Sequence, residues 1–273
     1  MNLEYLRQQY INDGFTLANA SAKVCQDVIL NKISKSTLSN NVTIKGGVVM
    51  YGLSNDKRRA TRDLDMDFIK YSLDNQSIKL FIKQLNKVDD GIVLNINGEI
   101  EKLHHHDYDG KRINLILSDN YGFTINTKLD IGVHNNFNIE QEEYCFNLDV
   151  IGENAILFIN SKEQILCEKL KSLLKFGIRS TRYKDIFDFY FLINYTNLKK
   201  DKLVDLINIL IINDDMMREN NLNDIINDLK IIFNNRNYLK QLENAKNNWL
   251  GISVDVVINN IISYFEAIEY INV

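Results

Sequence analysis

Proline is absent from this sequence of 273 residues, and cysteine occurs only three times. Without proline, helices must end at glycine, asparagine or capping side chains instead of at proline breaks. Cys25, Cys145 and Cys167 are far apart in the chain and form no CxxC pair, which disfavours both a disulfide framework and a zinc site. Free thiols fit a reducing compartment, so we expect a cytoplasmic protein.

Long apolar segments are also missing. No uninterrupted apolar run approaches the roughly 18 residues that a membrane-spanning helix needs. The first residues, MNLEYLRQQYINDG, contain no apolar stretch of the kind found in signal peptides. Apolar residues make up 45% of the chain and charged residues 25%, which is typical of a globular protein. We therefore expect no membrane partner.

The net charge of −4 disfavours a general polyanion-binding protein, because such proteins are usually basic overall. Basic residues nevertheless gather locally, in Lys57-Arg58-Arg59 with Arg62, and again between residues 162 and 184. Either group is suited to bind a triphosphate or an RNA backbone. The alternative, that both are ordinary solvated charges, stays open at this point.

The hydrophobic period changes along the chain. Before residue 160 it is mixed, and after it the period is helical to the end, which predicts an α+β part followed by helices. We predict helices at 3–33 with a break near Gly14, at 48–53 and at 76–88, and strands at 42–45, 63–69, 92–97, 112–118 and 123–133. Turns are expected at Asp109-Gly110 and at His104-His105-His106. Later helices are predicted at 161–176, 182–195, 200–213, 221–233, 236–247 and 254–270.

Acidic residues alternate with apolar ones in the segment RDLDMDF, residues 62–68. In a strand, Asp63, Asp65 and Asp67 share one face while the apolar residues enter the core. Neighbouring acids on that face are then roughly 6–7 Å apart at Cα, and their mutual repulsion favours a bound cation. The alternative is a set of solvent-facing aspartates with no ligand.

A second strand, at 123–133, places Asp130 as its only carboxylate on the face opposite the apolar residues. If this strand lies beside the first, Asp130 joins Asp63 and Asp65. Three carboxylates from two neighbouring strands are what two Mg²⁺ ions need, with water and substrate phosphates completing the octahedra. Such an ion pair activates an attacking hydroxyl and stabilises a leaving pyrophosphate.

Upstream of both strands, the segment VTIKGG ends in Gly46-Gly47. Two glycines allow backbone amides to approach a ligand closely, and a helix that starts just after them favours phosphate. By itself the pair is more typical of a plain turn.

The order and spacing of these motifs resemble the polymerase-β-like nucleotidyltransferase superfamily and, more closely, the AbiEii/AbiGii toxin family. That family carries an LKGG strand and turn, then RxSxDLDF, then a lone acidic strand residue. The matching segments here are IKGG at 44–47, RATRDLD at 59–65, with 15 residues between Gly47 and Asp63, and KLD at 128–130. QDVIL at 26–30, KEQILCEKL at 162–170 and RYKDIFDF at 182–189 also match in order, so the resemblance covers roughly residues 20–195. Val48 departs from it, since Ser or Thr often follows the glycines.

The resemblance implies a fold in which a nucleotidyltransferase domain with a mixed sheet flanked by helices, residues 1–160, precedes a helical bundle domain, residues 161–273. It implies catalysis and metal binding, by Mg²⁺ or Mn²⁺, at Asp63, Asp65 and Asp130, with the role of Asp67 open. NTP-binding residues would be Gly46, Gly47, Arg59, Lys169, Arg182, Asp185 and Asp188. The expected protein is the toxin of a toxin–antitoxin or phage-defence pair, with a cognate antitoxin and with RNA such as tRNA as acceptor.

Lys169 lies on an apolar stripe of the helix at 161–176, and Asp185 and Asp188 lie three residues apart on the next helix. The resemblance favours a nucleotide cleft for all three. The alternative is a set of salt bridges from the two acids to Lys169 or Arg182. For the whole chain, two other functions remain open, namely transfer to a small molecule or protein and a non-catalytic nucleotide- or partner-binding module.

Overall fold

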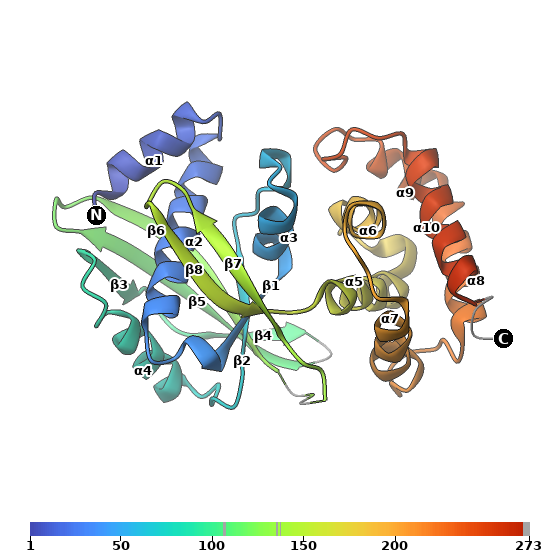
Figure 1. Cartoon of the computed structure of the whole chain (residues 1–273), viewed down its shortest axis with the longest axis horizontal. Coiled ribbons are helices and arrows are strands. Elements are labelled where there is room, and N and C mark those ends of the chain that lie inside the picture. Colours follow the sequence, from blue (N-terminus) through green and yellow to red (C-terminus); the bar gives the residue numbers. More distant parts are fainter. Residues whose placement is uncertain (106–107, 135, 137, 270–273) are drawn as a thin grey trace. The chain divides into compact units, whose positions relative to one another are not determined.

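The computed structural model describes residues 1–105, 108–134, 136 and 138–269 (Figure 1). The chain forms two compact units, Met1–Asn160 and Ser161–Val273, which are described separately below. Among the described residues, every helix is too short or too polar to traverse a lipid bilayer.

Within the described residues, unit 1 is built on one mixed sheet of eight strands. The strands are β1 Val42–Lys45, β2 Leu64–Phe68, β3 Ile92–Ile96, β4 Glu101–His105, β5 Tyr108–Asp119, β6 Thr124–Val133, β7 Glu142–Leu148 and β8 Glu153–Ile159. They are ordered β3-β5-β6-β2-β1-β8-β7, with β4 paired to β5. The β2–β6 and β1–β8 pairs are parallel and the others antiparallel. The three strands that carry the sequence motifs, β6, β2 and β1, are therefore consecutive in the centre of the sheet.

One face of this sheet forms the core of unit 1. Its strands turn alternate apolar side chains inward, as in β2, where Leu64, Met66 and Phe68 are 0–1% exposed. Four helices accompany the sheet, α1 Leu3–Asn12, α2 Leu17–Lys35, α3 Gly46–Ser54 and α4 Asn75–Leu85. Because the intervening residues of β2 face the other way, Asp65 and Asp67 lie on the opposite, polar face.

The first helical segment breaks where the sequence indicates. Helix α1 ends at Asn12, Gly14 follows with a φ of +92°, and α2 begins at Leu17. The Thr16 hydroxyl accepts a hydrogen bond from the Asn19 amide and so caps α2. In α2, Asp27 is fully buried and accepts hydrogen bonds from Tyr10 and Lys23, which ties α1 to α2.

Unit 2 consists of helices in its described residues. They are α5 Lys162–Phe176, α6 Lys184–Tyr195, α7 Lys200–Ile207, a π-helical turn at Asn208–Ile212, α8 Leu222–Phe233, α9 Arg236–Leu242 and α10 Val254–Glu269. Each α-helix buries apolar side chains at helical spacing, for example Leu166, Leu170 and Leu173 in α5. The predicted helix at 236–247 is the one that ends early, at Leu242.

Several strands were not predicted. β7 and β8 fill the stretch after residue 141 that the sequence left unassigned, and β4 pairs with β5 as a hairpin. The turn expected at Asp109-Gly110 is wrong, because both residues pair with β4 inside the longer strand β5. His104 and His105 belong to β4 instead of a turn, and His106 lies outside the described residues.

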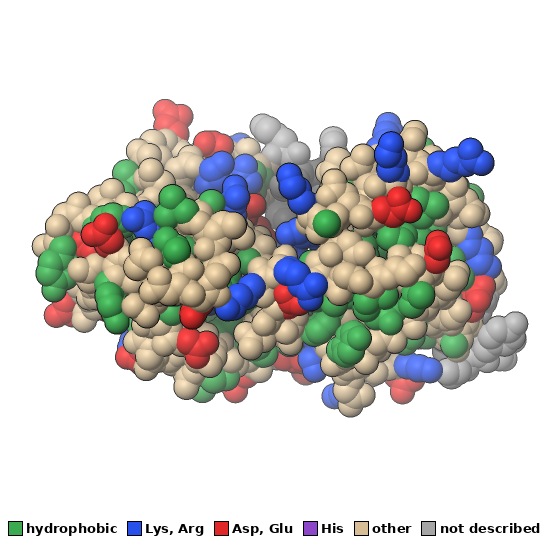
Figure 2. Space-filling model, turned by 90° about the horizontal axis from the view of Figure 1, so that it is seen from above, with side chains coloured by type: hydrophobic (Ala, Val, Ile, Leu, Met, Phe, Trp, Pro, Cys, Tyr) green, Lys and Arg blue, Asp and Glu red, His purple; other side chains and the backbone are tan. Residues whose placement is uncertain are grey.

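Charges of both signs share the surface. Figure 2 shows Lys and Arg side chains with Asp and Glu side chains among them on the visible face. This distribution agrees with a net charge of only −4.

Candidate active site

Asp65 and Asp130 are direct neighbours across two parallel strands. Asp65 on β2 is in register with Asp130 on β6, so the two side chains share the polar face of the sheet. Neighbouring strands are about 4.8 Å apart, which brings the two carboxylates next to each other. The strand of Asp130 therefore lies beside the strand of Asp65, which is the condition for a single site built from both strands.

Two cations flank this pair in the same row of the sheet. Lys45 on β1 is in register with Asp65, and Arg112 on β5 is in register with Asp130. Glu101 on β4 follows beyond Arg112. We call Lys45, Asp65, Asp130, Arg112 and Glu101 the charged row. Its two central acids repel each other, and the neighbouring cations offset part of that repulsion.

Arg112 binds Asp130 through two parallel hydrogen bonds. Its Nε donates to Asp130 Oδ1 at 2.8 Å and its Nη2 to Oδ2 at 2.7 Å. The side chains are 31% and 16% exposed, so the pair is partly shielded from water. Hydrogen bonding to Asp130 raises the pKa of Arg112 above its usual value, and the charges of Asp63 and Glu101 act in the same direction. Arg112 therefore stays positively charged.

The other two acids of the DLDMD segment differ in their surroundings. Asp63 directly precedes β2 and is exposed to solvent. Asp67 is only 7% exposed, and one of its oxygens lies 2.5 Å from Lys45 Nζ. Its register partners are Thr43 and Gly132, one row away from Asp65 and Asp130. Asp67 is thus the counter-ion of Lys45.

The glycine turn fits closely around this site. Gly46 has a φ of +69°, and a Cβ placed on it would lie 2.3 Å from Asp65 Oδ2. A Cβ on Gly47 would lie 2.7 Å from Cβ of Thr61, in the loop before β2. Both glycines are therefore required, because the turn packs directly against the acidic strand and its loop.

Helix α3 starts at Gly46, and no side chain caps its N-terminus. Its first backbone N–H groups have no partner within the helix, and the helix dipole is positive at this end. Val48, which takes the place of Ser or Thr, is 4% exposed and belongs to the core. Any contact to an anion here must come from the backbone and from Lys45.

Replacing Gly46 by Ala is expected to lower nucleotidyl transfer by about 10²-fold, because a displacement of about 1 Å at a reacting centre has an effect of that size. The new Cβ requires Asp65 to move. The positive φ adds a loss of roughly 1–2 kcal/mol in the free energy of unfolding. Steady-state transfer rates and thermal denaturation measure the two effects.

Gly98→Ala is the matched control, because Gly98 has a φ of +81° and nothing within 4 Å of the new Cβ. It should lose similar stability and keep its activity. Equal transfer rates for both variants would contradict the proposed contact between the turn and Asp65.

Gln26 holds the loop that leads into β2. Its side chain is 4% exposed, and its Nε2 donates to the carbonyl oxygens of Thr61 at 3.0 Å and Asp63 at 3.4 Å. Helix α2 thereby fixes the backbone of Asp63, although the Asp63 side chain itself reaches solvent.

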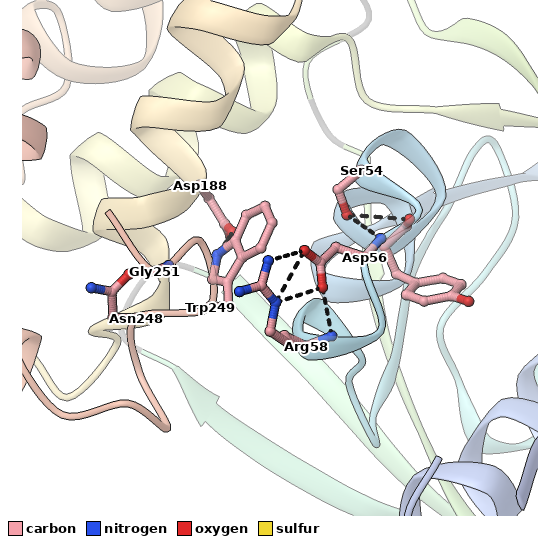
Figure 3. A network of polar contacts seen from close by, with 8 residues as sticks. Ser54, Asp56, Arg58, Asp188, Asn248, Trp249 and Gly251 are labelled. Atoms are coloured by element: carbon pink, nitrogen blue, oxygen red, sulfur yellow. Dashed lines mark hydrogen bonds and ion pairs between the residues drawn. The ribbon is translucent and has the colours of Figure 1, made fainter. Parts of the chain in front are cut away.

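The basic run before this loop has its own partners. Asp56 accepts three hydrogen bonds from the Arg58 side chain, from Nε at 3.1 and 3.2 Å and from Nη2 at 2.6 Å, and its own amide donates to Ser54 (Figure 3). Lys57 donates to the Asp13 carbonyl. Arg59, the predicted nucleotide ligand of this run, is 5% exposed and so lies beneath the surface.

Unit 2 contains a separate polar cluster. Lys169 on α5 lies 2.5 Å from Asp185 Oδ1 and 2.9 Å from Asp188 Oδ2, both on α6. Asp188 is 0% exposed and also accepts a hydrogen bond of 3.1 Å from Trp249 Nε1; both residues are labelled in Figure 3. Arg182, just before α6, is exposed. The salt bridges proposed as the alternative for these acids therefore exist within unit 2.

The comparison with protein families decides the identity of the chain. The family described as nucleotidyl transferase AbiEii toxin, type IV toxin–antitoxin system, matches residues 28–249. The chain belongs to this family. It is therefore a nucleotidyltransferase, and the match extends well beyond residue 195, where the resemblance read from its motifs ends.

No curated protein matches this AbiEii family member. Among solved structures, an antigenic nucleotidyltransferase-like protein from Paracoccidioides brasiliensis is similar, with 18% identity and a TM-score of 0.42. The similarity covers 81% of this chain and 91% of that one.

The acids of this AbiEii family chain fit a magnesium or manganese ion in kind, and two of them are neighbours. They offer oxygen donors, which these ions prefer, and Asp65 and Asp130 are side by side. The missing Cβ of Gly46 leaves room beside Asp65 Oδ2. In the part of the chain that the structure describes, no three His, Cys, Asp or Glu side chains converge closely enough to hold a metal. Arg112 donates a hydrogen bond to each oxygen of Asp130, so an ion bound there would compete with the guanidinium.

Sequence reasoning missed Arg112 and Gln26. Arg112 had a detectable signal, because Ile113, Leu115 and Leu117 point inward and so place Arg112 on the face of Asp130 once β5 and β6 pair. Gln26 was noted only as part of the QDVIL motif, and nothing local shows that its side chain contacts a loop 35 residues later.

Proposed function

We propose that this nucleotidyltransferase transfers NMP from an NTP to a hydroxyl group of RNA, such as tRNA, with Mg²⁺ or Mn²⁺ held by Asp63, Asp65 and Asp130. The register that pairs Asp65 with Asp130 on parallel strands is the observation that carries the proposal. It brings two motifs 65 residues apart to one place on the polar face of the sheet.

In the reaction, the acceptor oxygen forms a bond to the α-phosphorus, the bond from that phosphorus to pyrophosphate breaks, and pyrophosphate leaves. The bound metal supplies electrostatic stabilisation to the phosphates and lowers the pKa of the acceptor hydroxyl. Asp130 is the proposed acceptor of the hydroxyl proton. Gly46 and Gly47 present backbone N–H groups to the triphosphate, and Lys45 and Arg112 flank the two acids.

A nucleic-acid acceptor is favoured by the polar face next to the charged row. A groove of about 280 Å³ is lined by Asn97, Asn114, Asn126 and Lys128, together with Leu115 and Thr127. Lys128 and Asn114 form the register row adjacent to Asp130 and Arg112. Amides suit base edges and a lysine suits a phosphate, which is the combination that a terminal nucleotide needs. RNA and NTPs coexist in the cytoplasm, where we place this activity.

The roles proposed in unit 2 rest on the family resemblance alone. Lys169, Arg182, Asp185 and Asp188 are candidates for nucleotide binding, as is Arg59 in unit 1. The salt bridges of Lys169 with Asp185 and Asp188 give these three residues a structural function that does not depend on nucleotide binding. The toxin role within a type IV system implies a cognate antitoxin as a partner.

The decisive experiment incubates the protein with total RNA and each of the four α-labelled NTPs, with and without Mg²⁺. We expect label in an RNA band, its loss with EDTA, and a fall on the order of 10³-fold for Asp63→Ala. No label transfer by the wild type, or equal transfer by Asp63→Ala, would defeat the proposal. Label in protein or in a small molecule would instead support the alternative acceptor.

A further inference from the structure

Arg112 and a divalent ion require the same atoms. The guanidinium engages both carboxylate oxygens of Asp130, at 2.8 and 2.7 Å. The two hydrogen bonds leave further lone pairs on these oxygens, but a metal bound there would place a second cation directly beside the guanidinium, and like charges at that distance repel. Binding of one at Asp130 must therefore weaken binding of the other.

The position of Arg112 is fixed by the fold. Arg112 and Asp130 are register partners near one end of the β5–β6 pairing, which runs from Lys111–Ile131 to Ser118–Thr124, and both strands also pair with a second neighbour there, β5 with β4 and β6 with β2. A change of partner thus involves only the Arg112 side chain, because the backbone ladder holds both Cα atoms in place.

The Arg112 side chain also has somewhere to go. It is 31% exposed, compared with 16% for Asp130, so it reaches the solvent side of the pair. Its register partner on the far side is Glu101 on β4, an exposed carboxylate. A guanidinium released from Asp130 keeps a negative neighbour and remains on the face where the triphosphate is proposed to bind.

We propose that Arg112 is the resident counter-ion of Asp130 and is exchanged for the divalent metal when the metal binds, which frees the guanidinium for the phosphates of the nucleotide. This inference rests on the proposed metal-binding role of Asp65 and Asp130. It makes Arg112 a residue that sets metal affinity as well as one that contributes to catalysis. A protein without nucleotide should then bind metal weakly, and NTP and metal should strengthen each other's binding by linkage.

The test is a titration of the full chain with Mn²⁺ in the absence of nucleotide. Electron paramagnetic resonance of the free ion measures how much Mn²⁺ is bound. Arg112→Gln removes the competitor and should lower the Kd for Mn²⁺ about three- to fivefold, the upper part of the range that loss of one partly exposed ion pair allows. Arg112→Lys keeps a charge but loses the bidentate geometry, so its Kd for Mn²⁺ should lie between the values of the wild type and of Arg112→Gln.

Lys111→Gln is the matched control. Lys111 is the neighbouring residue of β5, points to the other face and donates to Asn75 at 3.1 Å. The Kd of the Lys111→Gln variant for Mn²⁺ should stay within twofold of the wild-type value. That result would exclude a general effect of net charge on metal binding. Adding Asp130→Asn to Arg112→Gln should abolish the gain in affinity.

An unchanged or weaker affinity in both Arg112 variants would overturn the inference, and so would a gain that persists without the Asp130 carboxylate. Failure of both Arg112→Gln and wild type to bind Mn²⁺ would overturn it as well. Because the titration needs no transfer reaction, its result is separate from that of the RNA-labelling experiment. A second measurement, the affinity of wild type and Arg112→Gln for NTP with saturating Mn²⁺, should show several-fold weaker NTP binding by the variant.

Discussion

Replacing Asp65 by Asn is expected to lower nucleotidyl transfer on the order of 10³-fold while the protein stays folded. Groups aimed at charge that develops in a transition state commonly contribute factors of 10²–10³ each, and Asp65 is the central acid of the proposed site. Asn has nearly the same shape, so β2 and the contact with Gly46 are retained. Steady-state rates with labelled NTP measure the loss.

The stability of Asp65→Asn provides the internal check. Like charges on directly opposed strand positions are destabilising, so removing one of the two central acids should leave the melting temperature within a few degrees of the wild type. Asp89→Asn makes the same chemical change at an exposed position of unit 1 and should change neither property. A fully active Asp65→Asn would remove Asp65 from the mechanism.

Replacing Lys169 by Met is expected to lower the free energy of unfolding of unit 2 by about 3 kcal/mol or more. Breaking a buried ion pair by removing one partner typically has an effect of 3–5 kcal/mol, because the other charge is left unpaired away from water. Asp188 is 0% exposed and loses its cation, although the Trp249 hydrogen bond remains. Urea denaturation followed by Trp249 fluorescence, the single tryptophan of the chain, reports on this unit directly.

Two further variants separate a structural role of Lys169 from a nucleotide-binding role. Lys171→Met removes a neighbouring ion pair to Asp214 whose side chains are 19% and 25% exposed, and should lower stability by only about 1 kcal/mol. Adding Asp188→Asn to Lys169→Met should restore part of the lost stability, since no unpaired charge stays buried. A raised KM for NTP that persists in the double variant would show that Lys169 also binds nucleotide. An unchanged urea midpoint for Lys169→Met would contradict the structural role.

Local pattern determined much of the fold. The alternating DLDMD segment predicted a strand with acids on one face, and the pleat of β2 places Asp65 and Asp67 opposite Leu64, Met66 and Phe68. The helical period after residue 160 predicted the helices of unit 2, because each one buries an apolar stripe that repeats every 3.6 residues. The break between α1 and α2 was also predicted locally, because Gly14 adopts a positive φ that ends a helix easily.

Strands whose burial depends on distant partners were harder to predict. β8 lies beside β1 as a parallel strand, although more than 100 residues separate them in the chain. β4 continues a hairpin with β5 through a segment rich in charge and histidine, where side-chain pattern gives little indication of pairing. The energy that stabilises a strand comes largely from its neighbouring strand, so the sequence of one segment alone does not show whether it forms a strand or which strand it pairs with.

For the candidate site, the sequence by itself determined which acids are present, that Asp65 and Asp130 each point away from an apolar strand face, and which family the motifs resemble. Only the tertiary structure decided that these two acids are register partners, that Lys45 and Arg112 flank them, and that Gly46 has to be glycine because of Asp65. The physical reason is that a strand's alternation follows from its own side chains, whereas its neighbours and register depend on the packing of the whole sheet.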